Sequence, residues 1–131
     1  MLPPSPHGLL YDPARRHFWK WLCAALVTVV GVAALTPSEF APNVTANDKF
    51  DHLLGFAALS ATGLLALTPG LGSAVLAGAG MLAYGALIEL LQTVVPGRFG
   101  DLQDLLADAV GVTLGLAMVT GLRWMFRTRQ R

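Results

Sequence analysis

Charge is the scarcest property of this 131-residue sequence, because only 13% of its residues are Asp, Glu, Lys or Arg. A soluble globular domain carries about 25% charged residues, and a chain with so few cannot cover its surface with them. Hydrophobic residues make up 54% of the chain, and its mean hydropathy is +0.58. The composition therefore excludes an ordinary soluble domain and predicts an integral membrane protein.

Cysteine is nearly absent as well. With Cys23 alone, the chain can form neither an internal disulfide nor a zinc site built from several cysteines. We expect Cys23, which lies near the start of an apolar stretch, to be a packing residue. The formal net charge of +1 provides no overall field that would attract nucleic acid. We therefore expect no nucleic-acid partner, and we assign no metal and no cofactor from the sequence.

Long apolar stretches are what the sequence has in place of charge. A helix needs about 20 mostly apolar residues to cross the hydrocarbon of a membrane. We predict an all-α membrane protein, a bundle of four transmembrane helices over residues 18–35, 50–68, 71–95 and 102–125. Residues 1–17 and 126–131 form the predicted tails, so residues 18–125 are the predicted membrane domain.

Lysine and arginine are distributed unevenly along the chain. Of the nine, Lys49 and Arg98 lie in the two polar loops, which leaves seven beside the termini. Positive residues collect on the cytoplasmic side of a membrane, so we predict that both termini are cytoplasmic and that these loops face outward. The alternative of a cleaved signal peptide is permitted by the basic flank and the Val32-Ala33-Ala34 end. The later helices keep the same orientation in either case.

Residues 88–111, IELLQTVVPGRFGDLQDLLADAVG, combine aliphatic side chains with acids. At about 1.5 Å of rise per residue, Glu89 and Asp108 lie at a similar depth from the loop between them. Asp101, Asp104 and Asp108 are spaced i, i+3, i+7, which places them on one helix face. A charge facing lipid costs about 2.5–3.5 kcal/mol on insertion scales. We therefore predict that these polar faces point at each other or into a wet cavity.

The neighbouring polar residues extend this predicted site. Gln92 shares the helix face of Glu89, and Arg98 in the loop can neutralise one or two of the carboxylates. Glycines at Gly111 and Gly115 form a GxxxG pattern that permits close helix contact. We expect the first apolar stretch to be mainly an anchor, and the pocket to be formed by the outer ends of the other three.

The start of the second apolar stretch supplies the remaining site residues. Asp48 is the predicted N-cap, and Asp51 in the first turn suits the helix dipole. Lys49 is a candidate interfacial cation, and the imidazole of His52 can reach Glu89 or an Asp of the last helix. The predicted binding residues are Asp48, Lys49, His52, Glu89, Gln92, Arg98, Asp101, Asp104 and Asp108.

These residues and their spacing resemble the VanZ-like membrane proteins. The patterns DKxxH, ExxQxxxPxR and DxxDxxxNxxG occur in this order within residues 48–118, with Asp108 in place of the Asn. The matching residues are Asp48, Lys49, His52, Glu89, Gln92, Pro96, Arg98, Asp101, Asp104 and Gly111. The resemblance implies a small multi-span protein of the bacterial cytoplasmic membrane. The family takes its name from a glycopeptide-resistance cluster, whose founding member is associated with teicoplanin resistance, and membership leaves the activity open.

The favoured function is that of a binding or accessory protein. Its outward polar pocket would hold the polar part of an envelope molecule, such as a lipid-linked precursor, a lipid head group or a glycolipopeptide. Lys49, His52 and Arg98 would meet phosphate or carboxylate, and the acids would meet hydroxyls or amines. Membrane lipids are the expected partners, and the oligomeric state is left open.

Three other functions remain open from the sequence. The first is a membrane-embedded enzyme that uses His52, Glu89 and Asp104 for acid–base or metal-assisted chemistry on an envelope lipid. The second is transport of protons or small ions, because acids inside a membrane often line such paths. The third is a structural role in which the polar cluster only joins the helices through hydrogen bonds.

Overall fold

The computed structural model describes residues 10, 12–42, 45 and 47–128, and this part contains four α-helices and no strand. The predicted all-α fold is therefore confirmed for the described residues. Residues 1–9, 11 and 129–131 of the predicted tails lie outside the description. The helices are α2 (Pro13–Ala34), α3 (Asp48–Leu65), α4 (Leu71–Gln92) and α5 (Leu102–Thr128).

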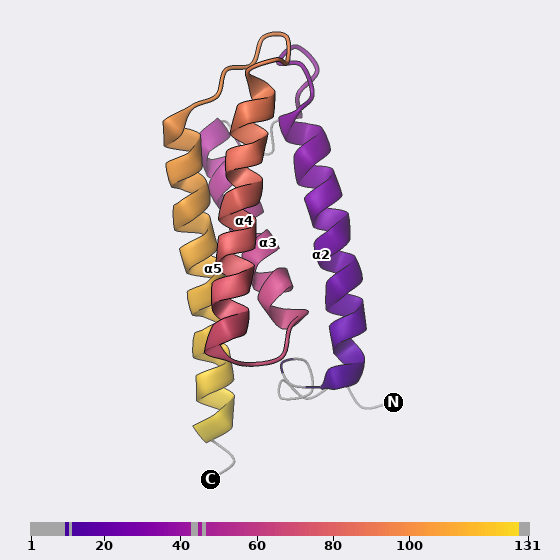
Figure 1. The fold of residues 1–131 in the computed structure, drawn as a ribbon, viewed down its shortest axis with the longest axis vertical. Helices are drawn as coiled ribbons and strands as arrows, with labels where there is room; N and C mark the ends of the chain where they lie inside the picture. The colour runs from indigo at the N-terminus through magenta and orange to yellow at the C-terminus, as the bar shows by residue number, and fades with distance from the viewer. Residues whose placement is uncertain (1–9, 11, 43–44, 46, 129–131) are drawn as a thin grey trace.

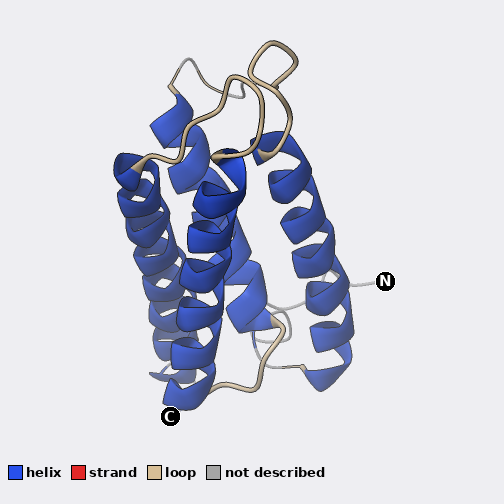
Figure 2. Cartoon of the chain, turned by 45° about the horizontal axis from the view of Figure 1, so that its top comes forward, coloured by secondary structure: helices blue, strands red, loops and turns tan. Residues whose placement is uncertain are grey.

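The four helices lie side by side and alternate in direction (Figure 1). The start of α2, the α3–α4 turn and the end of α5 lie at one end of the bundle (Figures 1 and 2). At the other end, α2 and α4 finish and α3 and α5 begin, and we call this the polar end. The alternation agrees with termini on one side of a membrane, while the identity of that side stays a prediction.

Three of the described helices, α2, α4 and α5, are long and apolar enough to cross a membrane. Helix α3 lies where the sequence predicts a fourth span, but its first turn carries three charged residues. It packs against all three other helices, and its His52, Ser60 and Thr62 side chains are buried, which keeps them from lipid, where polar groups are costly. Whether α3 crosses the whole membrane stays a prediction.

Helix α2 begins at Pro13 rather than at Phe18, where the apolar stretch starts. Asp12 is the N-cap, and its carboxylate accepts a hydrogen bond of 2.9 Å from the Ala14 N–H. Proline suits the first helical position because it has no N–H to leave unsatisfied there. Capping residues, and not hydropathy, therefore fix where this helix begins.

The prediction that Asp48 caps α3 is wrong. Asn47 holds that position, and its side-chain oxygen accepts a hydrogen bond of 3.0 Å from the Lys49 N–H. Asp48 and Asp51 lie in the first turn, where the positive end of the helix dipole stabilises them. Asn and Asp cap helices about equally well, so composition alone does not choose between neighbours.

The closest helix contact lies between α3 and α5. A Cβ atom at Gly111 would collide with the Leu53 carbonyl, and one at Gly115 would collide with the Ala57 carbonyl. The predicted GxxxG contact is therefore confirmed, and it brings the two backbones together. Next to it, buried apolar side chains form two clusters, Phe56, Leu59, Ile88 and Val112, and Ala61, Leu64, Ala77 and Val119.

Candidate functional site

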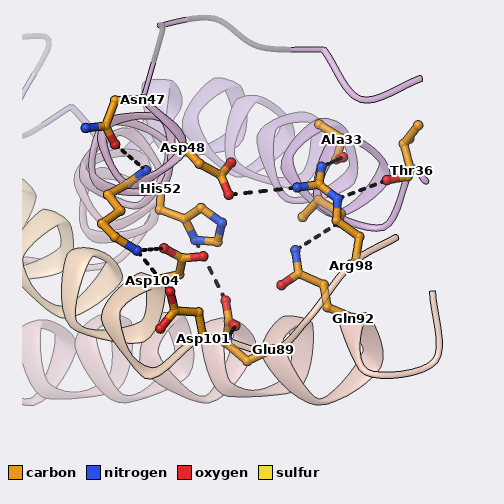
Figure 3. Close-up of polar contacts among 12 residues, drawn as sticks. Ala33, Thr36, Asn47, Asp48, His52, Glu89, Gln92, Arg98, Asp101 and Asp104 are labelled. Atoms are coloured by element: carbon orange, nitrogen blue, oxygen red, sulfur yellow. Dashed lines mark hydrogen bonds and ion pairs between the residues drawn. The ribbon is translucent and has the colours of Figure 1, made fainter. Parts of the chain in front are cut away.

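All nine predicted site residues lie at the polar end. They come from α3 (Asp48, Lys49, His52), α4 (Glu89, Gln92), the α4–α5 loop (Arg98, Asp101) and α5 (Asp104, Asp108). The labelled side chains surround a common space between the helix ends (Figure 3). Two helices begin here, and the positive ends of their dipoles favour the carboxylates gathered around them.

Lys49 is the cation that neutralises the acids of the α5 N-terminus. Its ammonium lies 3.0 Å from Asp101 Oδ2 and 3.0 Å from Asp104 Oδ1. Hydrogen bonds to Asp104 and Asp101 raise the pKa of Lys49 above its ordinary value. Asp104 is buried, so this pairing satisfies an acid that water reaches poorly. The sequence analysis treated Lys49 as an interfacial cation and a ligand-binding residue, and it did not identify these two acids as its partners.

Asp101 joins α4 to α5. Its Oδ1 accepts a hydrogen bond of 2.8 Å from the Gln103 N–H at the start of α5, and its own N–H donates to Glu89 Oε2 at 2.7 Å. The bond from Gln103, followed by the one from Lys49, holds the pKa of the Asp101 carboxyl below its usual value. Asp101 is therefore a helix cap that also fixes one oxygen of Glu89.

Arg98 does not neutralise Glu89 or the acids of α5, contrary to the prediction. Its Nη1 lies 3.8 Å from Asp48 Oδ2. Its Nε donates to the Thr36 carbonyl at 3.2 Å, and its Nη2 donates to the Ala33 carbonyl at 3.5 Å. Carbonyls at a helix C-terminus have no partner within the helix, and arginine is a suitable donor for them.

Helix α2 is therefore part of the site and not only an anchor. Besides the bonds from Arg98, the Gln92 amide donates to the Ala34 carbonyl at 3.0 Å. About two helical turns closer to the middle, the Tyr84 hydroxyl donates to the Val27 carbonyl at 2.6 Å. These acceptors are backbone atoms, so no residue type in α2 signals their role.

His52 contacts acids of two helices, as the sequence predicts. Its Nδ1 lies 2.9 Å from Asp108 Oδ1 and 3.9 Å from Glu89 Oε1. The Phe56 ring stacks against the imidazole at 6.4 Å between centroids, with 8° between the planes. Asp104, which the enzyme hypothesis paired with His52, instead bonds to Lys49.

Two cavities of opposite character adjoin the site. One, of about 450 Å³, is bordered mainly by apolar side chains of α2 and α3, among them Val29, Val30, Leu54 and Phe56. The other, of about 270 Å³, is bordered mainly by polar residues, which are Asp48, Lys49, Gln92, Arg98, Asp101 and Asp104, together with Gly97 and Phe99. Asp48 and Arg98 border both cavities.

Two sets of side chains bring metal-binding atoms within 4.8 Å of one another. One set is Asp48, His52 and Asp104, and the other is His52, Glu89 and Asp108. The residues of the second set are all buried, whereas Asp48 of the first set is exposed. The site can therefore offer imidazole and carboxylate ligands as well as hydrogen bonds.

Comparisons with known proteins agree with this architecture. No curated protein and no solved structure gives a significant match to the chain. A protein-family model described as VanZ/LLP1 matches residues 13–125, from the first residue of α2 to near the end of α5. The match includes every motif of the resemblance and, together with three apolar helices, supports a multi-pass membrane protein. This chain belongs to the VanZ-like family.

Proposed function

We propose that the polar end binds the head group of a cell-envelope lipid while the apolar cavity holds part of the lipid tail. The observation that carries this proposal is the pair of adjoining cavities, one apolar and one polar, with Asp48 and Arg98 in both walls. An amphiphile has the same division into an apolar and a polar part. A soluble polar ligand would leave an apolar cavity of about 450 Å³ unfilled.

The polar cavity favours a head group that carries both signs of charge, or an anion together with several hydroxyls. Lys49 and Arg98 supply donors for a phosphate or carboxylate, whereas three acids supply acceptors for ammonium or hydroxyl groups. A purely anionic head group would lie beside these carboxylates and would offer them no hydrogen-bond donor. The combination supports a zwitterionic lipid or a lipid-linked envelope precursor that carries amines or sugars.

The proposed setting is the cytoplasmic membrane of a bacterium, with both termini inside and the polar end facing outward. The distribution of lysine and arginine supports this orientation. The ligand would then come from the outer leaflet, where lipid-linked precursors and glycolipopeptides are present. Envelope maintenance, or resistance to glycopeptides, is the cellular role that such binding would serve.

Binding can be measured with the full-length chain in detergent and two defined probes, phosphatidylethanolamine and phosphatidylcholine. The ethanolamine ammonium has N–H donors for the acids and the choline ammonium has none, so we expect tighter binding of phosphatidylethanolamine. Lys49→Gln should weaken that binding at least about tenfold, as expected for loss of a hydrogen bond to a charged group. Arg98 is a poorer target, because its loss also frees the end of α2.

Arg127→Gln is the matched control, since Arg127 lies in the last turn of α5, at the opposite end of the bundle. It should bind phosphatidylethanolamine as tightly as the unchanged chain. Equal affinity of the Lys49→Gln variant and the unchanged chain would show that the polar cavity does not hold the head group. A thermal melt of each variant confirms that the folded protein is being compared.

Acid–base chemistry on the same lipid is the second candidate function. The separation of 2.9 Å between His52 Nδ1 and Asp108 Oδ1 supports it, since a carboxylate can orient an imidazole for proton transfer. His52 also borders the apolar cavity. If the unchanged chain converts the phosphatidylethanolamine probe to a product and a His52→Gln variant does not, the function includes a reaction. Without any product, binding alone remains.

A further inference from the structure

Two buried carboxylates at the polar end have no lysine or arginine of the described residues beside them. Within the described residues, the basic group in ion-pair range of Glu89 and Asp108 is His52. Asp108 is 0% exposed and Glu89 is 9% exposed. Two such anions, so close together, are costly unless a proton or a cation neutralises them.

One oxygen of each of these carboxylates also lacks a hydrogen-bond partner among the residues that the structure describes. In the part of the chain that the structure describes, Glu89 Oε1 and Asp108 Oδ2 are buried acceptors that nothing satisfies. A buried acceptor left in this state destabilises the fold. The other two oxygens are both bound, Glu89 Oε2 to the Asp101 N–H and Asp108 Oδ1 to His52.

We propose that His52, Glu89 and Asp108 bind one divalent metal ion, and that this ion is zinc or one with the same ligand preference. An imidazole with two carboxylates is a ligand set that zinc accepts, whereas magnesium and calcium prefer oxygen ligands alone. The ion would cancel the two negative charges, bind the free Oε1 of Glu89, and take the place of the proton between His52 Nδ1 and Asp108 Oδ1. The proposal does not rest on the proposed lipid binding, because it uses neither Lys49 nor Arg98.

The distances are compatible with one ion. Zinc binds nitrogen and oxygen at about 2.0–2.2 Å, which in a tetrahedral site sets neighbouring ligand atoms about 3.3–3.6 Å apart. His52 Nδ1 lies 2.9 Å from Asp108 Oδ1 and 3.9 Å from Glu89 Oε1, on either side of that range. All three ligand atoms lie within 4.8 Å of one another, so side-chain adjustments of about 1 Å would complete the set.

The surroundings fix the three ligands in place, as outer partners do at metal sites. The Asp101 N–H holds Glu89 at 2.7 Å, and the Phe56 ring stacks against His52. A Cβ atom at Gly85 would lie 2.6 Å from Asp108 Oδ2, so the glycine leaves room for that oxygen. His52 also borders the larger cavity.

The other set of metal-binding atoms, which shares His52 and adds Asp48 and Asp104, is the weaker choice. Lys49 already neutralises Asp104, and Arg98 lies beside Asp48. A metal there would have to compete with these cations. The two sets can be separated experimentally, because Asp108 belongs only to the first and Asp104 only to the second.

The test uses the full-length chain in detergent, stripped of metal with a chelator and dialysed against zinc, manganese, magnesium or calcium separately. Bound metal is measured by mass spectrometry of the elements. We expect one equivalent of zinc. Asp108→Asn should weaken zinc binding at least about 100-fold, since losing even an outer partner of a ligand costs about 10- to 100-fold. Asp104→Asn is the matched control and should keep its affinity within about threefold, a difference below 1 kcal/mol.

Each result of the metal-binding measurement either supports or overturns the proposed site. Less than a tenth of an equivalent of zinc on the unchanged chain would mean that a proton neutralises the acids, and equal losses in the two Asn variants would point to the other set. Either result overturns it. If Asp108→Asn fails to fold, cobalt binding to the unchanged chain is measured instead. A visible spectrum that zinc abolishes supports the metal site, whereas the spectrum of aqueous cobalt overturns the proposal.

Discussion

At the scale of single residues, Asp101 connects several groups at the polar end. It caps α5, accepts from Lys49 and donates its N–H to Glu89. Its folded-state pKa lies below the unfolded-state value because the first two contacts favour the charged form. The stability that it adds is complete above the unfolded-state pKa and is lost as pH falls through the lower, folded-state pKa.

Replacing Asp101 with Asn should therefore change the acid sensitivity of the fold. Asn keeps the capping acceptor but cannot titrate or form an ion pair. The melting temperature of Asp101→Asn should lie below that of the unchanged chain at pH 7, and the gap should close as pH falls below about 4, the unfolded-state value. Thermal melts in detergent at several pH values check this. A gap that stays constant down to pH 3 would contradict it.

The sequence predicted which residues lie in the site better than it predicted which of them pair with one another. Helical spacing was enough to place Glu89, Asp104 and Asp108 toward the interior, because a charge facing lipid is costly. Spacing does not say which cation meets which acid. The loop carries Arg98 to carbonyls of α2 and leaves the acids of α5 to Lys49, and this depends on helix packing that one sequence does not encode in residue types.

At the scale of helices, the contact between α3 and α5 gives a sharp prediction. Gly111→Ala should destabilise the fold by about 1–3 kcal/mol, the usual cost of overpacking, because its Cβ would meet the backbone of Leu53 and Ala57, which cannot rotate away. Gly121→Ala on the same helix is the control. Nothing lies within 4 Å of a Cβ there, so it should gain up to about 1 kcal/mol of helix propensity.

Thermal melting of both glycine variants in one detergent measures the difference. A Gly111→Ala variant as stable as Gly121→Ala would mean that the two backbones lie further apart than the structure places them. The GxxxG spacing predicted this contact, yet it did not identify α3 as the partner helix. That choice follows from the small residues on the face of α3 that meets the two glycines, where Ala57, Ser60 and Ala61 lie.

The helices themselves were predictable because four apolar stretches leave few alternatives, whereas their ends were not. The sequence placed the end of the third helix at residue 95, and α4 ends at Gln92. Leu91 and Val94 are exposed, so apolar character there continues past the helix and misleads a prediction based on hydropathy. Caps and tight turns set the boundaries, and these depend on short polar contacts.

At the scale of the whole molecule, the alternating helices predict where reagents can reach the chain. In a Cys23→Ala background, a cysteine at Glu39 lies in the loop at the polar end, and one at Thr68 lies in the α3–α4 turn. With both termini inside, a maleimide that cannot cross membranes should label Glu39→Cys on intact cells. It should label Thr68→Cys only after the cells are opened. The reverse pattern would invert the orientation.

The position of the apolar cavity affects how a lipid of the proposed kind would arrive. Exposed Val29 and Leu54 lie on its border, so it communicates with the outer surface of the bundle between α2 and α3. Pulling a lipid tail into water costs about 0.8 kcal/mol per methylene group. A lipid that slides in sideways from its own leaflet would keep its tail out of water throughout, so only the head group would change its surroundings, and neither a carrier nor an energy source would be required.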